Sequence, residues 1–264
     1  MADLGSLLQQ ISGGNPLLLA ALGGLFTSIL NMLGAVPILF LRGGSSGRIS
    51  DLGLGFAAGV MLAASFTSLI LPGIERGGIL PVFAGIIIGA ILISLMDRLI
   101  PHMHALIGVE GLSTRRLKAI WLFILAITIH NMPEGLAVGV SLSSGDLASG
   151  VALMMAIALQ NIPEGLSVGL SLIATGSYSR GKAYLASSLS GFVELPLAVL
   201  GAIAVVSIHK IVPYAMGFAA GAMIFVVSDE IIPEVHRLGR EKAITYSLIV
   251  GLLVMLLLDS MLSA

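Results

Sequence analysis

Long runs of apolar residues, separated by short stretches rich in Gly, Pro and charge, dominate the chain. A helix needs about 20 mostly apolar residues to cross the hydrocarbon core of a bilayer. Eight runs approach or exceed that length, at residues 16–41, 51–74, 78–100, 117–143, 148–174, 182–207, 212–236 and 242–262. The pattern predicts an all-α integral membrane protein with eight transmembrane helices, forming a single polytopic domain over residues 1–264.

Composition supports a membrane protein and narrows its chemistry. The chain is 57% hydrophobic and only 10% charged, whereas soluble domains carry roughly 25% charged residues. Its net charge of −1 provides no basic surface for a nucleic-acid backbone, so we expect no nucleic-acid partner. The chain contains no cysteine, which excludes disulfides and thiolate metal sites. Any metal must therefore be bound by nitrogen, oxygen or thioether ligands.

The basic residues are distributed unevenly between alternate loops. Only Arg76 and Lys210 fall on one side of the expected topology. The other basic residues lie in or beside the loops after the first, third, fifth and seventh spans: Arg42, Arg48, Arg98, Arg115, Arg116, Lys118, Arg180, Lys182, Arg237, Arg240 and Lys242. The positive-inside rule then places the loop of residues 101–117 in the cytoplasm and both termini outside it. This pattern is typical of a plasma membrane, and it suits a bacterial inner membrane.

Two sequence repeats connect spans that run in opposite directions. The segment HNMPEGL at residues 130–136 is echoed by QNIPEGL at residues 160–166, and GFAAG occurs at residues 55–59 and 217–221. Antiparallel pairs of this kind are typical of inverted-repeat transporters, which bind their substrate where the repeats meet. We therefore expect an inverted repeat of helices 1–3 and 6–8 around a central pair of helices 4 and 5.

The repeated segments place carboxylates where hydrocarbon is expected. Glu134 and Glu164 lie within apolar spans, and a charge at the bilayer centre costs roughly 2.5 to 3.5 kcal/mol on insertion scales. His130 precedes Glu134 by four residues, as Gln160 precedes Glu164, so each pair lies on one helical face. A bound cation would compensate the buried charge.

Further polar groups lie at the same level of the chain. Asn131 and Asn161 lie about 100° around each helix from His130 and Gln160, which indicates an adjacent second position for an ion. Pro133 and Pro163 cannot donate to the carbonyls four residues earlier, and backbone of this kind survives at membrane depth only inside protein or beside a wet cavity. Glu194 is a third membrane-embedded acid that could face the same place.

These motifs resemble those of the ZIP (Zrt/Irt-like) divalent-metal transporters, in particular the bacterial GufA-like branch. The resemblance is carried by HNMPEG at 130–135, QNIPEG at 160–165, GFAAGVMLAAS at 55–65 and SDEIIPEVH at 228–236. It implies an eight-helix fold with the inverted repeat described above, a binuclear metal site between helices 4 and 5, and a homodimer. It also implies transport of divalent metal into the cytoplasm, with no enzymatic activity and no resident cofactor.

The resemblance assigns ligands residue by residue. The primary ion would be held by Met61, His130, Gln160 and Glu164. Its neighbour would be surrounded by Asn131, Glu134, Asn161, Glu164 and Glu194. Many family members have His where this chain has Gln160, and Glu where it has Asn161. Because amide oxygens suit a broader range of cations than imidazole, we expect zinc and cadmium to bind, with iron and manganese as further substrates.

Other residues are given a role by the resemblance alone. Asp97, His102, His104, Asp229 and Glu230 would form a cytoplasmic exit route with auxiliary metal sites. The alternative is that about half of such residues are interfacial caps or solvated loop groups. Likewise, Met61 on its apolar helix is either a thioether ligand or ordinary core filling.

Several functions remain open at the level of sequence. The first is a carrier that moves divalent metal by alternating access. The alternative is a selective metal-ion channel with the same ligands. An intramembrane zinc protease would need an HExxH helix, whereas here the order is His, Asn, Met, Pro, Glu. A sensing or purely structural membrane protein would need a soluble domain or longer loops to pass on a signal.

Overall fold

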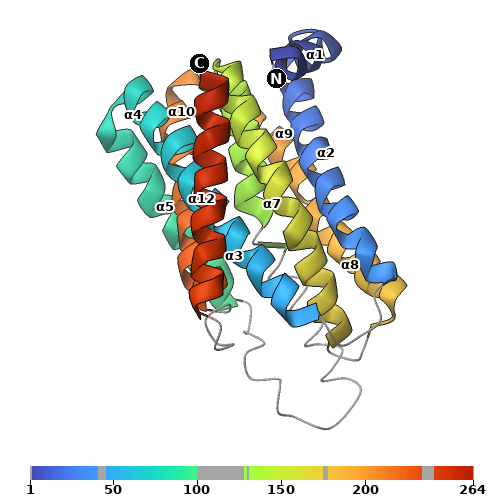
Figure 1. Ribbon diagram of the computed structural model, residues 1–264. Helices are drawn as coiled ribbons and strands as arrows, with labels where there is room; N and C mark the ends of the chain where they lie inside the picture. Colours follow the sequence, from blue (N-terminus) through green and yellow to red (C-terminus); the bar gives the residue numbers. More distant parts are fainter. Residues whose placement is uncertain are drawn as a thin grey trace.

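The computed structural model describes residues 2–40, 46–99, 128–129, 131–174, 178–233 and 241–263, and within these ranges all regular secondary structure is helical. The helices form an elongated bundle with both termini at the same end (Figure 1). Seven helices among the described residues are long and apolar enough to cross a membrane. The prediction of a helical membrane protein is thus confirmed.

The described helices follow the predicted spans closely. A short helix α1, Ala2–Ser12, comes first and was not predicted. The elements of the first three spans are α2 (Pro16–Ala35) with a 3-10 turn (Val36–Leu39), then α3 (Ser46–Ala64), a π-helical segment (Ser65–Ile70) and α4 (Leu71–Gly77), then α5 (Ile79–Leu99). Within the predicted fourth span, residues 131–143 are helical.

The second half of the chain contains the remaining elements. They are α7 (Leu147–Ala174), α8 (Arg180–Phe192), α9 (Glu194–Ser207), a 3-10 turn (His209–Ile211), α10 (Val212–Val226), a π-helical segment (Val227–Ile231) and α12 (Glu241–Ser263). The sixth span is divided at Val193, because Pro196 has no N–H to donate to the carbonyl of Phe192. In contrast, α7 continues through Pro163.

The two π-helical segments occupy equivalent positions after the repeated GFAAG motif. One begins at Ser65, ten residues after Gly55, and the other begins at Val227, ten residues after Gly217. A π-helical segment contains an extra residue within a helix. The second and seventh spans therefore share a departure from regular helix as well as a sequence motif.

Close helix contacts at glycines join α3, α4, α5, α10 and α12, which we call the flanking group. A Cβ built on Gly59 of α3 would lie 1.9 Å from the carbonyl oxygen of Leu248 on α12. A Cβ on Gly221 of α10 would lie 2.2 Å from that of Ile86 on α5. Gly77, at the end of α4, packs against the ring of Pro213 in the same way. Small residues thus let these backbones touch, as is common in membrane bundles.

A second set of glycine contacts joins α2, α7, α8, α9 and residues 131–143, which we call the hairpin group. A Cβ on Gly34 of α2 would lie 2.0 Å from the carbonyl oxygen of Ile162 on α7. A Cβ on Gly139 would lie 1.9 Å from that of Ala198 on α9. The two groups meet chiefly where α3 packs along α7, with Gly53 against Pro163.

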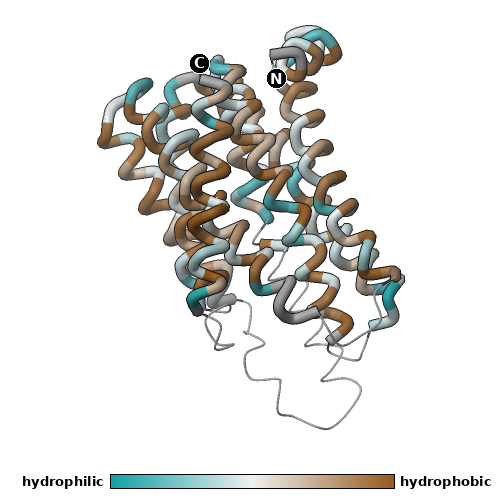
Figure 2. Tube along the Cα trace, in the orientation of Figure 1, coloured by the Kyte–Doolittle hydropathy of each residue, from teal (hydrophilic) through white to brown (hydrophobic). Residues whose placement is uncertain are grey.

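The outer surface of the bundle is apolar. Large hydrophobic side chains such as Leu80, Ile87 and Leu253 are more than half exposed. In Figure 2, hydrophobic residues dominate the length of α5, α10 and α12, whereas hydrophilic residues gather at helix ends and in the middle of the bundle. An apolar outer surface with a buried polar cluster is unlike a soluble protein and fits a multi-pass membrane protein.

Candidate metal centre

The repeated PEG segments bring the predicted acids and amides together in the interior. Glu134 lies on the helix of residues 131–143, while Gln160, Asn161 and Glu164 lie on α7. Glu194 is the first residue of α9. Each of these side chains is at most 2% exposed. Asn131, at the start of the 131–143 helix, is equally buried.

Amide groups on α7 connect the two neighbouring carboxylates. Gln160 Nε2 donates a hydrogen bond of 2.5 Å to Glu134 Oε1. Asn161 Nδ2 donates to Glu194 Oε1 at 2.7 Å and to the backbone oxygen of Thr27 at 3.2 Å. The amides therefore direct their N–H groups towards one oxygen of each carboxylate, and their own oxygens lie elsewhere.

Four buried oxygens in this cluster have no hydrogen-bond donor: Glu134 Oε2, Gln160 Oε1, Asn161 Oδ1 and Glu194 Oε2. A buried acceptor without a partner costs about 1 to 3 kcal/mol, and more when it is charged. Carboxylate and amide oxygens are ligands for divalent cations. A bound cation would therefore supply the partner that these four oxygens lack.

The electrostatics favour positive charge at the same place. The carboxylates of Glu134, Glu164 and Glu194 are near enough to repel one another when ionised. Burial in low dielectric strengthens that repulsion, because the interaction is screened far less than in water. A divalent cation among them would replace repulsion by attraction.

Backbone contacts with glycines hold Glu194 in place. A Cβ on Gly24 of α2 would lie 3.0 Å from the carbonyl oxygen of Glu194, and a Cβ on Gly135 would lie 2.6 Å from it. The residue that carries the third acid is therefore enclosed between α2 and the helix that carries Glu134. The first span also contributes two buried polar side chains, Thr27 and Asn31, which were not predicted as part of the site. The sequence feature that could have indicated them is a polar turn within an apolar run.

The other predicted ligands are placed less completely. His130, His102 and His104 lie outside the described residues, as do the side chains of Asp97 and Glu230. Asp229 is exposed on the second π-helical segment. The predicted exit route therefore stays a prediction. Within the described ranges, no three His, Asp or Glu side chains form a metal-binding group. Met61 is fully buried in the apolar core with Ile157, as either a ligand or a core residue would be.

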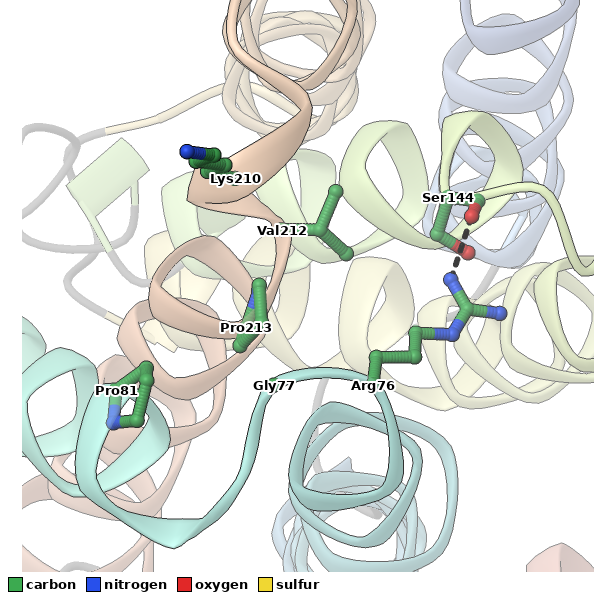
Figure 3. A pocket seen from close by; sticks show the side chains of 7 residues that line it. All are labelled: Arg76, Gly77, Pro81, Ser144, Lys210, Val212 and Pro213. Atoms are coloured by element: carbon green, nitrogen blue, oxygen red, sulfur yellow. Dashed lines mark hydrogen bonds between the residues drawn. The ribbon is translucent and has the colours of Figure 1, made fainter.

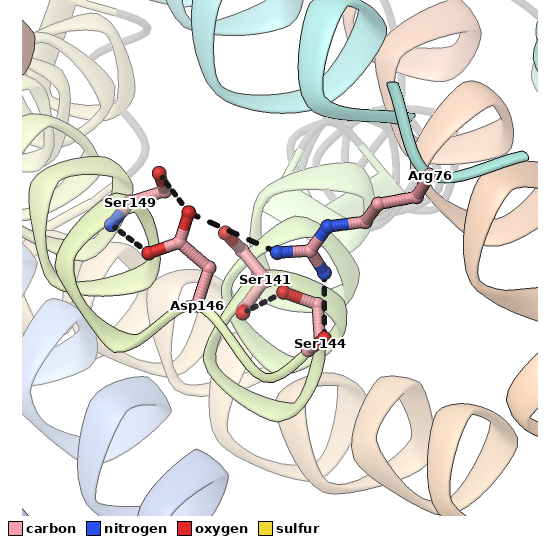
Figure 4. A network of polar contacts seen from close by, with 5 residues as sticks. All are labelled: Arg76, Ser141, Ser144, Asp146 and Ser149. Atoms are coloured by element: carbon pink, nitrogen blue, oxygen red, sulfur yellow. Dashed lines mark hydrogen bonds and ion pairs between the residues drawn. The ribbon is translucent and has the colours of Figure 1, made fainter. Parts of the chain in front are cut away.

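A second polar cluster lies where spanning helices end, around the tip between residues 143 and 147. Arg76 contacts Ser144 and Asp146 there (Figure 4). Burial alone would raise the pKa of Asp146, but hydrogen bonds from Ser149 and the neighbouring Arg76 guanidinium hold the pKa below its ordinary value. Asp146 is therefore ionised at neutral pH.

The fold and the buried cluster define a multi-pass helical membrane protein with a carboxylate and amide centre where two repeated segments meet. Residues 108–259 match the family described as ZIP Zinc transporter, and the chain belongs to this ZIP family.

Three relatives illustrate the similarity. The chain is 44% identical to zinc transporter ZIPB of Bordetella bronchiseptica, covering 91% of this chain and 80% of the relative. It is 37% identical to zinc transporter GufA of Myxococcus xanthus, over 86% and 92% of the two chains. It is 35% identical to human zinc transporter ZIP11, over 95% and 99%. The resemblance inferred from the motifs is thus confirmed.

Proposed function

We propose that the protein transports divalent transition-metal cations, zinc foremost, across the membrane and into the cytoplasm. The observation that carries this proposal is the set of four buried oxygens without donors, on Glu134, Gln160, Asn161 and Glu194. Family membership and the names of the relatives support the same substrate.

The ligands divide into two neighbouring positions. Glu164 and Gln160 would hold the primary ion together with His130 and Met61, as the resemblance implies. Asn161, Asn131 and Glu194 would surround the second ion, with Glu134 and Glu164 near both. Amide oxygens bind borderline cations less firmly than imidazole, which suits a site that must release its ion. Cadmium, iron and manganese are therefore further substrates in this proposal.

Two observations support eight spans and an inverted repeat. Both termini lie at the same end of the bundle (Figure 1), and only an even number of crossings returns the chain to its starting side. An eighth crossing would include the helix of residues 131–143. The GFAAG motifs and the π-helical segments after them recur at equal spacing in spans two and seven, as a repeat requires.

Alternating access is the mechanism that we propose. The candidate ligands lie mainly in the hairpin group, whose backbones touch at glycines, and the flanking group is joined in the same way. Each group would move as a unit, with sliding between α3 and α7. A channel would instead keep one continuous path open, without such relative movement.

The test is metal uptake by purified protein in liposomes. We expect saturable, strongly temperature-dependent zinc uptake, which Glu164→Ala abolishes and Gln160→Ala reduces. Gln10→Ala removes an amide that is exposed on α1 and is the matched control. Competition by cadmium, iron and manganese ranks the substrates. Wild-type uptake in Glu164→Ala would refute the site, and flux that neither saturates nor depends strongly on temperature would favour the channel.

The remaining features of the proposal rest on the resemblance and the charge pattern. They are a homodimer, a bacterial inner-membrane location with both termini outside the cytoplasm, and the absence of enzymatic activity. The order of residues at 130–134 places Pro133 at one of the central positions of the HExxH motif of a zinc protease, which argues against hydrolysis.

A further inference from the structure

Arg76 joins the two groups of helices at the end of the bundle that we assign to the outside. It lies in the last turn of α4, in the flanking group. Its Nη1 donates a 2.6 Å hydrogen bond to the backbone oxygen of Ser144, in the tip of the hairpin (Figure 3). Its Nη2 lies 3.8 Å from Asp146 Oδ2. The guanidinium thus reaches from one group to the other.

The hairpin tip offers Arg76 a preformed set of acceptors. Ser144 Oγ donates to the backbone oxygen of Ser141 at 2.7 Å, which fixes the turn at the end of the 131–143 helix. Asp146 caps α7, since its carboxylate accepts from Ser149 N at 3.1 Å and from Ser149 Oγ at 2.7 Å (Figure 4). The Ser144 carbonyl also lies at the negative end of a helix dipole. The backbone carbonyl of Ser144 and the carboxylate of Asp146 therefore both favour a cation at this position.

The backbone that carries Arg76 is also held in place. Gly77, next to Arg76, packs so closely on Pro213 that a Cβ there would lie 2.1 Å from the proline ring. The base of the Arg76 side chain is thus anchored to α10 of the flanking group, and only the guanidinium reaches across.

An open pocket lies beside this contact. It has a volume of about 440 Å³ and is lined by Gly77, Pro81, Val212 and Pro213 as well as by Arg76 and Ser144. Lys210 lines it too, but its ammonium points away from the hairpin tip (Figure 3). On the side of this pocket, the tip contacts the flanking group through Arg76.

We infer that Arg76 is a positioning residue for transport, which holds the tip of the ligand-bearing hairpin against the flanking group and must release it when the groups move. The inference rests on the proposed alternating-access function. The hydrogen bonds of Gln160, Asn161 and Ser187 stay within the hairpin group, and Ser247 bonds within the flanking group. Movement between groups leaves those bonds intact, whereas it breaks the contacts of Arg76.

The size of the effect follows from the type of bond. Hydrogen bonds to charged groups are stronger than neutral ones, while partial exposure weakens the ion pair. Arg76 and Asp146 side chains are 26% and 41% exposed. We expect loss of the contact to change the ratio of the two conformations by about threefold to tenfold.

A distance measurement on the full protein tests this directly, because the natural chain has no cysteine. Spin labels are attached to Ile79→Cys on α5 and Ala148→Cys on α7, two exposed positions in different groups. The distance distribution is then measured in liposomes without metal. We expect Arg76→Gln to broaden it or add a second population.

Matched variants distinguish the effect of losing the Arg76 contact from the effects of a change in charge or in folding. Asp146→Asn removes the charge but keeps a residue that caps helices well, and should have a smaller effect of the same kind. Arg76→Lys should restore part of the original distribution. Lys210→Gln removes the other basic side chain of the pocket and should leave it unchanged. An unchanged distribution in both Arg76→Gln and Asp146→Asn, or an equal change in Lys210→Gln, would overturn the inference.

Uptake kinetics provide the functional measurement. A positioning role predicts that Arg76→Gln changes the maximal rate of zinc uptake by threefold or more, while KM stays within twofold. A larger change in KM than in rate would contradict it. If the unmodified protein took up no metal, transport itself would be refuted, yet the distance distributions would still decide whether Arg76 holds the hairpin tip.

Discussion

Gly135→Ala should disturb the candidate metal centre without changing any of its side chains. Gly135 follows Glu134, and a Cβ there would lie 2.6 Å from the carbonyl oxygen of Glu194 and 2.7 Å from its Cα. Ordinary contacts begin at 3.4 Å, so the methyl group needs about 0.8 Å of additional space. Because the obstructing atoms are backbone atoms of α9, the helix itself must shift.

The shift can be converted into two magnitudes. Overpacking of a tight interior typically costs about 1 to 3 kcal/mol of unfolding free energy. Metal–ligand distances tolerate only about 0.2 Å, so a displacement of Glu194 relative to Glu134 should weaken binding. Changes in groups that orient ligands lower metal affinity by about 10- to 100-fold, and we expect a loss in that range.

Equilibrium binding of zinc and thermal unfolding in detergent measure both effects. The control is Gly181→Ala on α8, where a Cβ meets nothing within 4 Å. That change should leave zinc affinity unaltered and slightly stabilise the helix, since alanine is the better helix former. Wild-type affinity and stability in Gly135→Ala would refute the close packing of α9 against the hairpin.

Three further predictions concern acid, topology and selectivity. Folding lowers the pKa of Asp146. Its contribution to stability is therefore present above the unfolded pKa of 3.8 and is lost as pH falls through the folded pKa. The difference in thermal stability between wild type and Asp146→Asn should be constant from pH 7 to about 5 and shrink only in stronger acid. An impermeant maleimide applied to intact cells should label Ala148→Cys but not Ser179→Cys until the membrane is opened; the reverse pattern would invert the orientation. Gln160→His should raise the preference for zinc over manganese in competitive uptake, and an unchanged ratio would contradict its role as a ligand.

Sequence pattern predicted most of the fold because lipid imposes a simple rule. A spanning helix must be long and apolar, so the spans beginning near Pro16, Ile79 and Glu241 were recognisable within a few residues. The π-helical segments and the division at Val193 were not predicted. They depend on how a helix packs against its neighbours, or on a proline whose effect varies with context: Pro196 divides one span, while Pro163 leaves α7 continuous.

The candidate site was predicted to a similar extent and for a related reason. Acids and amides such as Glu134 and Asn161 are conspicuous in an apolar run because each is costly in lipid. Contacts between helices could not be predicted in the same way. Nothing in the sequence shows that Gln160 donates a hydrogen bond to Glu134, or that Arg76 contacts a turn 68 residues further along the chain. Such contacts are set by tertiary packing and require coordinates.

The π-helical segment Ser65–Ile70 changes the partner to which one helix offers its small residues. In a regular helix each residue turns by about 100°, so Gly59 and Gly73, fourteen residues apart, would face within about 40° of each other. The wider π turn takes up one extra residue, so the rotation between the two glycines falls by about 100° and they face about 140° apart. As a result, Gly59 fits against Leu248 of α12, while Gly73 fits against Val82 of α5 and Met216 of α10. A single span thereby packs closely against different helices in the two halves of its length.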